Sequence, residues 1–124
     1  MTPHFPASSV ACKCGCGMLP KADFMEKVEA LRVKLGFPLP VTSAARCATH
    51  NAKVSATGAS GPHTTGRALD VGVRGENALR VIVEARNMGF TGIGVSQKGA
   101  ARFIHIDDLP NAEGQPRPTV WSYP

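Results

Sequence analysis

The sequence centres on Pro62-His63-Thr64-Thr65-Gly66-Arg67-Ala68-Leu69-Asp70. His63 lies in a segment rich in glycine, serine and threonine, which predicts a loop, whereas Asp70 lies in an apolar segment that predicts a strand. Burying an unpaired carboxylate in an apolar strand is costly, so Asp70 needs a partner. Gly66 allows the chain to turn back between the two, so that both side chains can point at one spot.

A second apolar segment with polar residues lies downstream, at Phe103-Ile104-His105-Ile106-Asp107. Residues two apart on a strand share a face, so we expect His105 and Asp107 to face the same cleft. Two histidines and an aspartate with an open fourth position are the ligand set of a catalytic zinc ion. The sequence therefore predicts one Zn²⁺ ion bound by His63, Asp70 and His105.

Length and composition indicate one domain over residues 1–124, with residues 1–11 as a loosely packed lead-in. Only 6% of the residues are aromatic, which predicts an aliphatic core. The net charge of +5 suits an acidic polymer, but the basic residues are scattered, which favours neither nucleic acid nor an anionic cell wall. The sequence shows no apolar run of about 18 residues and no signal peptide, so we expect a soluble protein made in the cytoplasm.

Four cysteines form a group whose state the sequence leaves open: Cys12, Cys14, Cys16 and Cys47. Alternate cysteines are too close to bridge one another comfortably, which allows one disulfide between the first three and Cys47. A second metal site is another alternative, although structural zinc sites usually space their paired cysteines by two to four residues. Free thiols are the third. A nucleic-acid binder with a zinc knuckle would use the same cysteines, but few aromatic side chains are available to stack on bases.

Two amphipathic helices are predicted. The first starts with Asp23 as N-cap and Glu26 as its capping-box partner, and it ends at Gly36. Its expected buried stripe is Phe24, Val28, Leu31 and Leu35. The second helix spans residues 77–88, and its expected buried residues are Leu79, Ile82, Val83 and Met88. A shorter helical turn is expected at residues 47–53, in which His50 is structural rather than a ligand.

The stretch 38–43 is predicted to lead into a short strand, and further strands are predicted at residues 68–73, 90–95 and 102–106. A hairpin turn joins the last two. Prolines before the first strand suggest an edge position or an entry into the sheet. Residues 119–123 are expected to add a last edge strand that walls one side of the cleft. Hairpin strands with helices between them indicate an α+β fold, in which helices pack on a small, mostly antiparallel sheet.

These motifs resemble the zinc D-alanyl-D-alanine carboxypeptidase family, which includes L-alanyl-D-glutamate endopeptidases and shares its fold with Hedgehog signalling domains. The resemblance rests on His-x₆-Asp from His63 to Asp70, Ser-x-x-Arg from Ser43 to Arg46, and His-x-Asp from His105 to Asp107. Cys-Gly-Cys-Gly at 14–17 and the C-terminal Arg-Pro and Trp-Ser-Tyr are similar to small phage and prophage members. The resemblance implies the same Hedgehog-like fold here.

Site roles follow from this resemblance. Sequence alone allows Arg46 to be an ordinary surface residue or a bidentate partner for a substrate carboxylate, and the resemblance favours the second role. Ser43 and Trp121 are expected to contact substrate as well. The family mechanism needs a carboxylate that takes a proton from water. Several members carry it three residues before the last histidine, where this chain has Arg102, so Asp107 is the predicted base.

The resemblance implies a zinc metallopeptidase that hydrolyses peptidoglycan stem peptides, near D-Ala-D-Ala or at the L-Ala-D-Glu bond. We expect it to act as a monomer, without nucleic acid or membrane partners. The similarity to phage members implies delivery to the bacterial cell wall by a phage or prophage. Arg102 motivates an alternative, which is a non-catalytic zinc-containing module that binds the wall or has a structural role.

Overall fold

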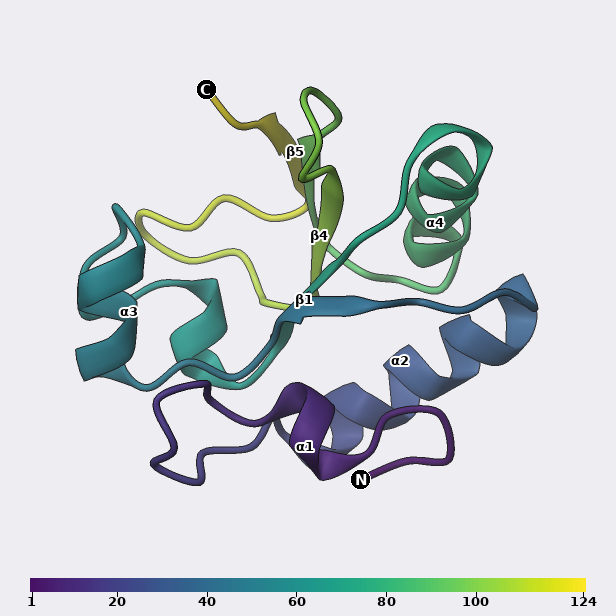
Figure 1. Cartoon of the computed structure of the whole chain (residues 1–124). Helices are drawn as coiled ribbons and strands as arrows, with labels where there is room; N and C mark the ends of the chain where they lie inside the picture. The colour runs from purple at the N-terminus through teal and green to yellow at the C-terminus, as the bar shows by residue number, and fades with distance from the viewer.

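A five-stranded sheet lies at the centre of the structure, a computed structural model that describes residues 1–124 (Figure 1). Its strands are β1 (Val41–Ser43), β2 (Ala68–Val71), β3 (Gly92–Ser96), β4 (Phe103–Asp107) and β5 (Thr119–Ser122). They lie in the order β1-β2-β4-β3-β5, and all neighbours are antiparallel except the parallel pair β3 and β5. The predicted α+β fold with a mostly antiparallel sheet is confirmed.

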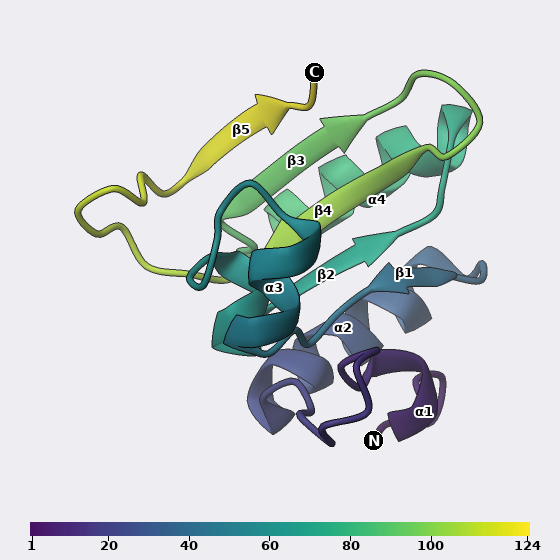
Figure 2. The ribbon, with the colours of Figure 1, turned by 60° about the vertical axis from the view of Figure 1, so that its left-hand side comes forward.

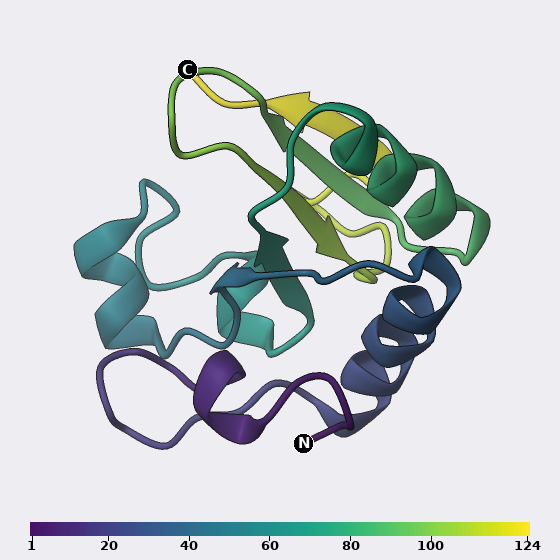
Figure 3. The same cartoon turned by 45° about the vertical axis from the view of Figure 1, so that its right-hand side comes forward.

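Helices lie on both faces of this sheet (Figure 2, Figure 3). α2 (Ala22–Leu35) and α4 (Gly75–Asn87) pack against each other on one face. α3 (Ala48–Val54) lies on the opposite face, with the 3₁₀ helix η1 (Pro62–Thr65) beside it. The short α1 (Ala7–Val10) contacts the edge strand β1. None of these helices combines the length and the apolar composition needed to cross a lipid bilayer.

The main core lies between the sheet and the pair α2 and α4. The predicted stripe of α2 is fully or almost fully buried, and Met25 joins it. Phe24 packs edge-on against Phe90, with ring centroids 6.1 Å apart. Gly36 ends the helix in the left-handed conformation (φ 77°), as the sequence predicted. This packing fixes one face of the sheet and leaves the α3 face for the site.

The first turn of α2 differs from the predicted capping box. Its N-cap is Lys21, and Asp23 lies inside the first turn without capping it. The Asp23 carboxylate instead accepts two hydrogen bonds from Arg67, which lower its pKa to about 2. Arg67 also donates two bonds of 2.8 Å to Asp108, just after β4. The cap prediction was wrong because this long-range ion pair takes the carboxylate.

The buried side of α4 also differs from the prediction. Ile82 and Met88 pack against the core, but Leu79 and Val83 are 61% and 47% exposed. The fully buried residues of this helix are Ala78, Val81 and Ala85. Small side chains on this stripe let the helix approach the sheet closely, which turns the larger residues toward solvent.

Residues 1–11 are not the loosely packed lead-in that the sequence suggested. Phe5 and Val10 belong to the main core. The Val10 carbonyl accepts a hydrogen bond of 3.2 Å from the Ala45 amide, which attaches this segment to the chain just after β1. Phe5 and Val10 lie in a segment with prolines and serines and without a periodic apolar pattern, so the sequence did not predict that they are buried.

Candidate metal centre

One row of residues crosses the whole sheet and carries most of the site. Ser43 of β1 pairs with Asp70 of β2, and Asp70 pairs with His105 of β4. Gly94 of β3 pairs with His105 on the other side and with Trp121 of β5. Paired residues present their side chains on the same face of a sheet. The row therefore collects residues from five separate segments of the chain on the α3 face.

His63 completes the cluster from η1, outside the sheet. Gly66 follows in the left-handed conformation (φ 74°) and turns the chain from η1 into β2, as expected from the sequence. The Nε2 atom of His63 lies 3.3 Å from Oδ2 of Asp70, and Nδ1 of His105 lies 3.0 Å from Oδ1 of Asp70. Ligand atoms around a tetrahedral zinc ion lie about 3.3–3.6 Å apart, given bonds of about 2.0–2.2 Å. The three side chains therefore fit one zinc ion.

Hydrogen bonds select the ring nitrogen that each histidine offers to a metal. Nδ1 of His63 lies 2.7 Å from the Ala44 carbonyl oxygen, so we assign the ring proton there, which leaves Nε2 free. Nε2 of His105 lies 2.8 Å from Oδ2 of Asp107, so we assign its proton there, which leaves Nδ1 free. Both free nitrogens face Asp70. Such partners fix the orientation and tautomer of metal-binding histidines.

The electrostatics of the cluster favour a cation at its centre. Burial raises the pKa of Asp70, but the adjacent His105 and His63 rings, when each carries a second proton, lower it well below its usual value. Burial lowers the pKa of His105, but its bonds to Asp107 and Asp70 outweigh this and raise it. The site thus holds its carboxylate charged and attracts positive charge, which a divalent metal ion supplies.

The cluster lines a cavity of about 950 Å³, a volume that suits a peptide-sized ligand. The segment from Val54 to Thr65 forms one wall, and the loop from Glu113 to Arg117 forms another. Trp121 and Tyr123 line the cavity from the C-terminal segment, which agrees with the predicted wall. The cavity lies on the face of the sheet that α2 and α4 leave open.

Comparison with known families gives an independent result. A model of the family described as peptidase M15 matches residues 3–107, which is most of the chain. The chain belongs to the peptidase M15 family. This family contains the zinc D-Ala-D-Ala carboxypeptidases, and its members are zinc-dependent peptidases that act on peptidoglycan. A comparison with curated proteins found no match. The matched range includes the metal cluster but ends before the 113–117 loop and β5.

Arg46 lies in the same cavity as the metal cluster, where its side chain can bind a ligand. Its guanidinium lines the cavity, donating 2.6 and 2.8 Å hydrogen bonds to Ser43 Oγ and Asn51 Oδ1. Asn51 is buried and donates its own amide protons to Thr57 and Gly58, so its orientation is fixed. No carboxylate of the chain pairs with Arg46. Ser43, expected to contact substrate, instead holds Arg46 and does not line the cavity.

Asp107 does not lie where a base of an M15 peptidase would be expected. Its side chain has no exposed surface and does not line the cavity. Arg117 donates two hydrogen bonds to it, at 2.9 and 2.8 Å, His105 provides a third at 2.8 Å, and the Leu109 amide donates a fourth at 3.3 Å. Burial raises the pKa of Asp107, but the bonds from His105 and Arg117 lower it to about 2. These contacts orient His105 and correct our expectation that Asp107 faces the cleft.

Two glycines of β3 make room for this arrangement. A Cβ atom on Gly92 would overlap the Asp107 carboxylate. A Cβ atom on Gly94 would lie 2.8 Å from both Trp121 Nε1 and Tyr123 Oη. The Trp121 ring therefore lies over the sheet, 5.0 Å from the His105 ring. The sequence showed these glycines only as interruptions of a strand.

Sequence reasoning missed several residues of the site. Arg117 and Asn51 bind predicted site residues, but nothing in their local pattern pointed to a partner. Glu113 lines the cavity from the loop that precedes β5. Arg102 lies in the hairpin turn and donates to the Gly99 carbonyl, away from the site. The aromatic residues Trp121 and Tyr123 were the one sequence feature which indicated that the C-terminal part of the chain contributes to the site.

Proposed function

We propose that the protein is a zinc metallopeptidase that hydrolyses peptidoglycan stem peptides, as a D-Ala-D-Ala carboxypeptidase or an L-Ala-D-Glu endopeptidase. The observation that carries this proposal is the unpaired guanidinium of Arg46 in the same cavity as the metal cluster. Both target bonds lie next to a free carboxylate. One cavity can therefore hold that carboxylate on Arg46 and present the amide to the cluster.

The residues of the cluster have distinct tasks in this proposal. His63, Asp70 and His105 would hold the ion. When bound, zinc supplies a Lewis acid that polarises a peptide carbonyl and makes water a nucleophile near neutral pH. Ala44 and Asp107 fix the tautomer and the orientation of the two imidazoles. Arg46 fixes the substrate, which lowers the entropic cost of bringing the amide to the site.

A substitution at Arg46 tests the carboxylate-binding role. We expect Arg46→Ala to lower kcat/KM by about 10- to 100-fold, because charge-assisted hydrogen bonds contribute about 1.5–3 kcal/mol. The substrate pair for this measurement is a stem peptide and its analogue with the carboxylate next to the scissile bond amidated. The unaltered protein should prefer the acid strongly, whereas Arg46→Ala should treat the two alike. An unchanged preference in the variant would refute the assignment.

The proton acceptor needs a carboxylate on the cavity wall, and only Asp70 and Glu113 provide one. Asp70 would bind the metal ion and is therefore not free to accept a proton. Glu113 lies with Gly114 at the tip of a turn closed by two hydrogen bonds between Ala112 and Gln115. The carboxylate makes no hydrogen bond or ion pair within the chain. We therefore propose Glu113 as the general base, in place of Asp107.

Glu113→Gln should keep zinc but lower kcat by about 10²-fold, which is a typical contribution of a general base. Asp107→Asn should behave differently, with zinc affinity falling by about 10- to 100-fold, as for other partners of metal-binding histidines. Steady-state kinetics at saturating zinc, together with metal titrations, separate the two effects. Full turnover by Glu113→Gln would remove Glu113 from the mechanism.

Mass spectrometry of purified muropeptides incubated with the zinc-loaded protein tests the function itself. Loss of a terminal alanine would establish a carboxypeptidase, and a new end at D-Glu would establish an endopeptidase. Either product should disappear in a chelated sample. Zinc-loaded protein that binds these fragments but yields no product would instead support a non-catalytic wall-binding module.

A further inference from the structure

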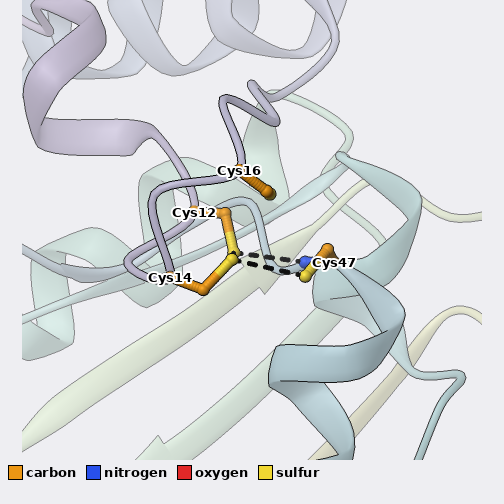
Figure 4. Close-up of side chains that lie close together, drawn as sticks. All are labelled: Cys12, Cys14, Cys16 and Cys47. Atoms are coloured by element: carbon orange, nitrogen blue, oxygen red, sulfur yellow. Dashed lines mark hydrogen bonds between the residues drawn. The ribbon is translucent and has the colours of Figure 1, made fainter.

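Four cysteine side chains lie close together at the start of α3 (Figure 4). Cys12, Cys14 and Cys16 come from the N-terminal loop, and Cys47 comes from the residue just before α3. All four are free thiols, and their Sγ atoms lie within 4.8 Å of one another. The Sγ atom of Cys14 lies 3.4 Å from that of Cys12 and 3.5 Å from that of Cys47. The metal cluster described above uses none of these residues.

These separations match a single tetrahedral ion. Zinc–sulfur bonds of about 2.3 Å place the sulfurs of a four-cysteine site about 3.8 Å apart. A disulfide needs its two sulfurs at about 2.0 Å and involves two of the four residues only. An iron–sulfur cluster distributes the four thiolates over two or four iron atoms, which spreads the sulfurs further apart. One ion at the centre of the four sulfurs is therefore the arrangement that the geometry favours.

The local backbone explains how alternate cysteines can converge. The amide of Cys12 donates to the Met18 carbonyl at 2.9 Å, which closes the loop. Gly15 and Gly17 adopt the left-handed conformation, with φ of 84° and 87°, and fold the chain tightly between these ends. The unusual Cys-x-Cys-x-Cys spacing argued against a metal site in the sequence, but the two glycines remove that objection.

Backbone amides also point at the sulfurs. The Cys47 amide donates to Sγ of Cys12 at 3.3 Å, and the His50 amide donates to Sγ of Cys47 at 3.4 Å. Hydrogen bonds to the sulfur favour the thiolate form, which is the form that binds metals. Two of the four sulfurs are thus already oriented by the fold.

We propose that Cys12, Cys14, Cys16 and Cys47 bind a second zinc ion, in a structural site with no open coordination position. Four thiolates fill the tetrahedron, so this ion has no place for a substrate. The site would fasten the N-terminal loop to Cys47, the neighbour of Arg46 in the chain. The Arg46 amide in turn donates to the His63 carbonyl at 3.2 Å. The second zinc would therefore hold the segment that bears the substrate anchor in place.

Metal content tests this proposal without reference to peptidase activity. Elemental analysis of the purified full chain should give about two zinc ions per chain, one in each kind of site. Cys47→Ser should retain about one, and so should His105→Ala, whereas the double variant should retain none. Lys13→Ala, a change in the same loop that leaves all four thiols, is the matched control and should retain both ions. Equal zinc content in Cys47→Ser and the unaltered chain would overturn the proposal.

Cobalt substitution decides the question even if the cysteine variants fold poorly. The unaltered chain loaded with Co²⁺ should show an intense thiolate-to-cobalt charge-transfer band and the visible bands of a tetrahedral ion. His105→Ala should keep the charge-transfer band, because its thiolates are intact. A cobalt spectrum without thiolate bands, a protein mass lower by two hydrogens from a disulfide, or iron in place of zinc would each overturn the proposal. None of these readings depends on which peptide bond the other site cleaves.

Discussion

His63→Ala and His105→Ala should each remove the catalytic zinc ion and the peptidase activity together. Each substitution deletes one of only three protein ligands and removes one of the two imidazole partners of the buried Asp70 carboxylate. Loss of a mere hydrogen-bond partner of a ligand costs about 10- to 100-fold in metal affinity, so loss of the ligand itself should cost more than about 10²-fold. Muropeptide cleavage and zinc content, measured on the same preparations, check both losses.

His4→Ala is the matched control, because this histidine pairs with Glu29 on the surface and does not contact the cluster. It should keep zinc and activity. The four-cysteine site would keep its own ion in every one of these variants, so the zinc content should fall by one ion rather than to zero. Cleavage by His63→Ala within about tenfold of the unaltered protein would contradict the assigned ligand set.

Arg117→Ala should cause the largest loss of stability that we predict. The Arg117 side chain is 6% exposed and provides two of the three hydrogen bonds that Asp107 accepts from side chains. Its removal leaves a fully buried carboxylate without a cation, which costs about 3 kcal/mol. The stacking of Arg117 on Trp121, with the guanidinium 5.1 Å from the ring centroid, is lost as well. Thermal unfolding in chelator should show a Tm lower by about 10 °C.

Two further variants define the cause. Arg102→Ala removes an arginine that binds only the exposed Gly99 carbonyl, so its free energy of unfolding should change by less than about 0.5 kcal/mol. Adding Asp107→Asn to Arg117→Ala removes the stranded charge and should restore at least about 1 kcal/mol. If the double variant were as unstable as the sum of the two single changes, the ion pair would not explain the effect.

The metal cluster could be predicted from the sequence because polar residues alternate with apolar ones along two strands. Asp70, His105 and Asp107 interrupt apolar strands, and the register places Asp70 directly beside His105. His63 could be added because a turn-forming glycine separates it from β2. The α+β fold followed from the same hairpin pattern, since strand and helix periodicities survive in a short chain.

Long-range contacts account for what the sequence could not show. The capping pattern at Asp23 is local, but Arg67, far along the chain, takes its carboxylate. Asp107 shares a face with His105 as predicted, yet Arg117 covers it, and no pattern links those two residues. In α4, Leu79 and Val83 are more hydrophobic than alanine and were therefore predicted to be buried. Close packing of the helix on the sheet instead favours the small side chains of Ala78 and Ala85 on the buried side. Each error concerns a partner that only the tertiary structure supplies.

The single tryptophan of the chain lies at the metal centre, with its ring 5.0 Å from that of His105. Indole emission from this protein therefore reports on the cavity beside the metal cluster without any added label. A paramagnetic ion such as Cu²⁺ or Co²⁺ would quench it on binding to His63, Asp70 and His105, while a peptide entering the cavity would shift its wavelength. Titrations followed by fluorescence can thus give the affinities of metal and substrate in the intact chain, with no competing signal from a second indole.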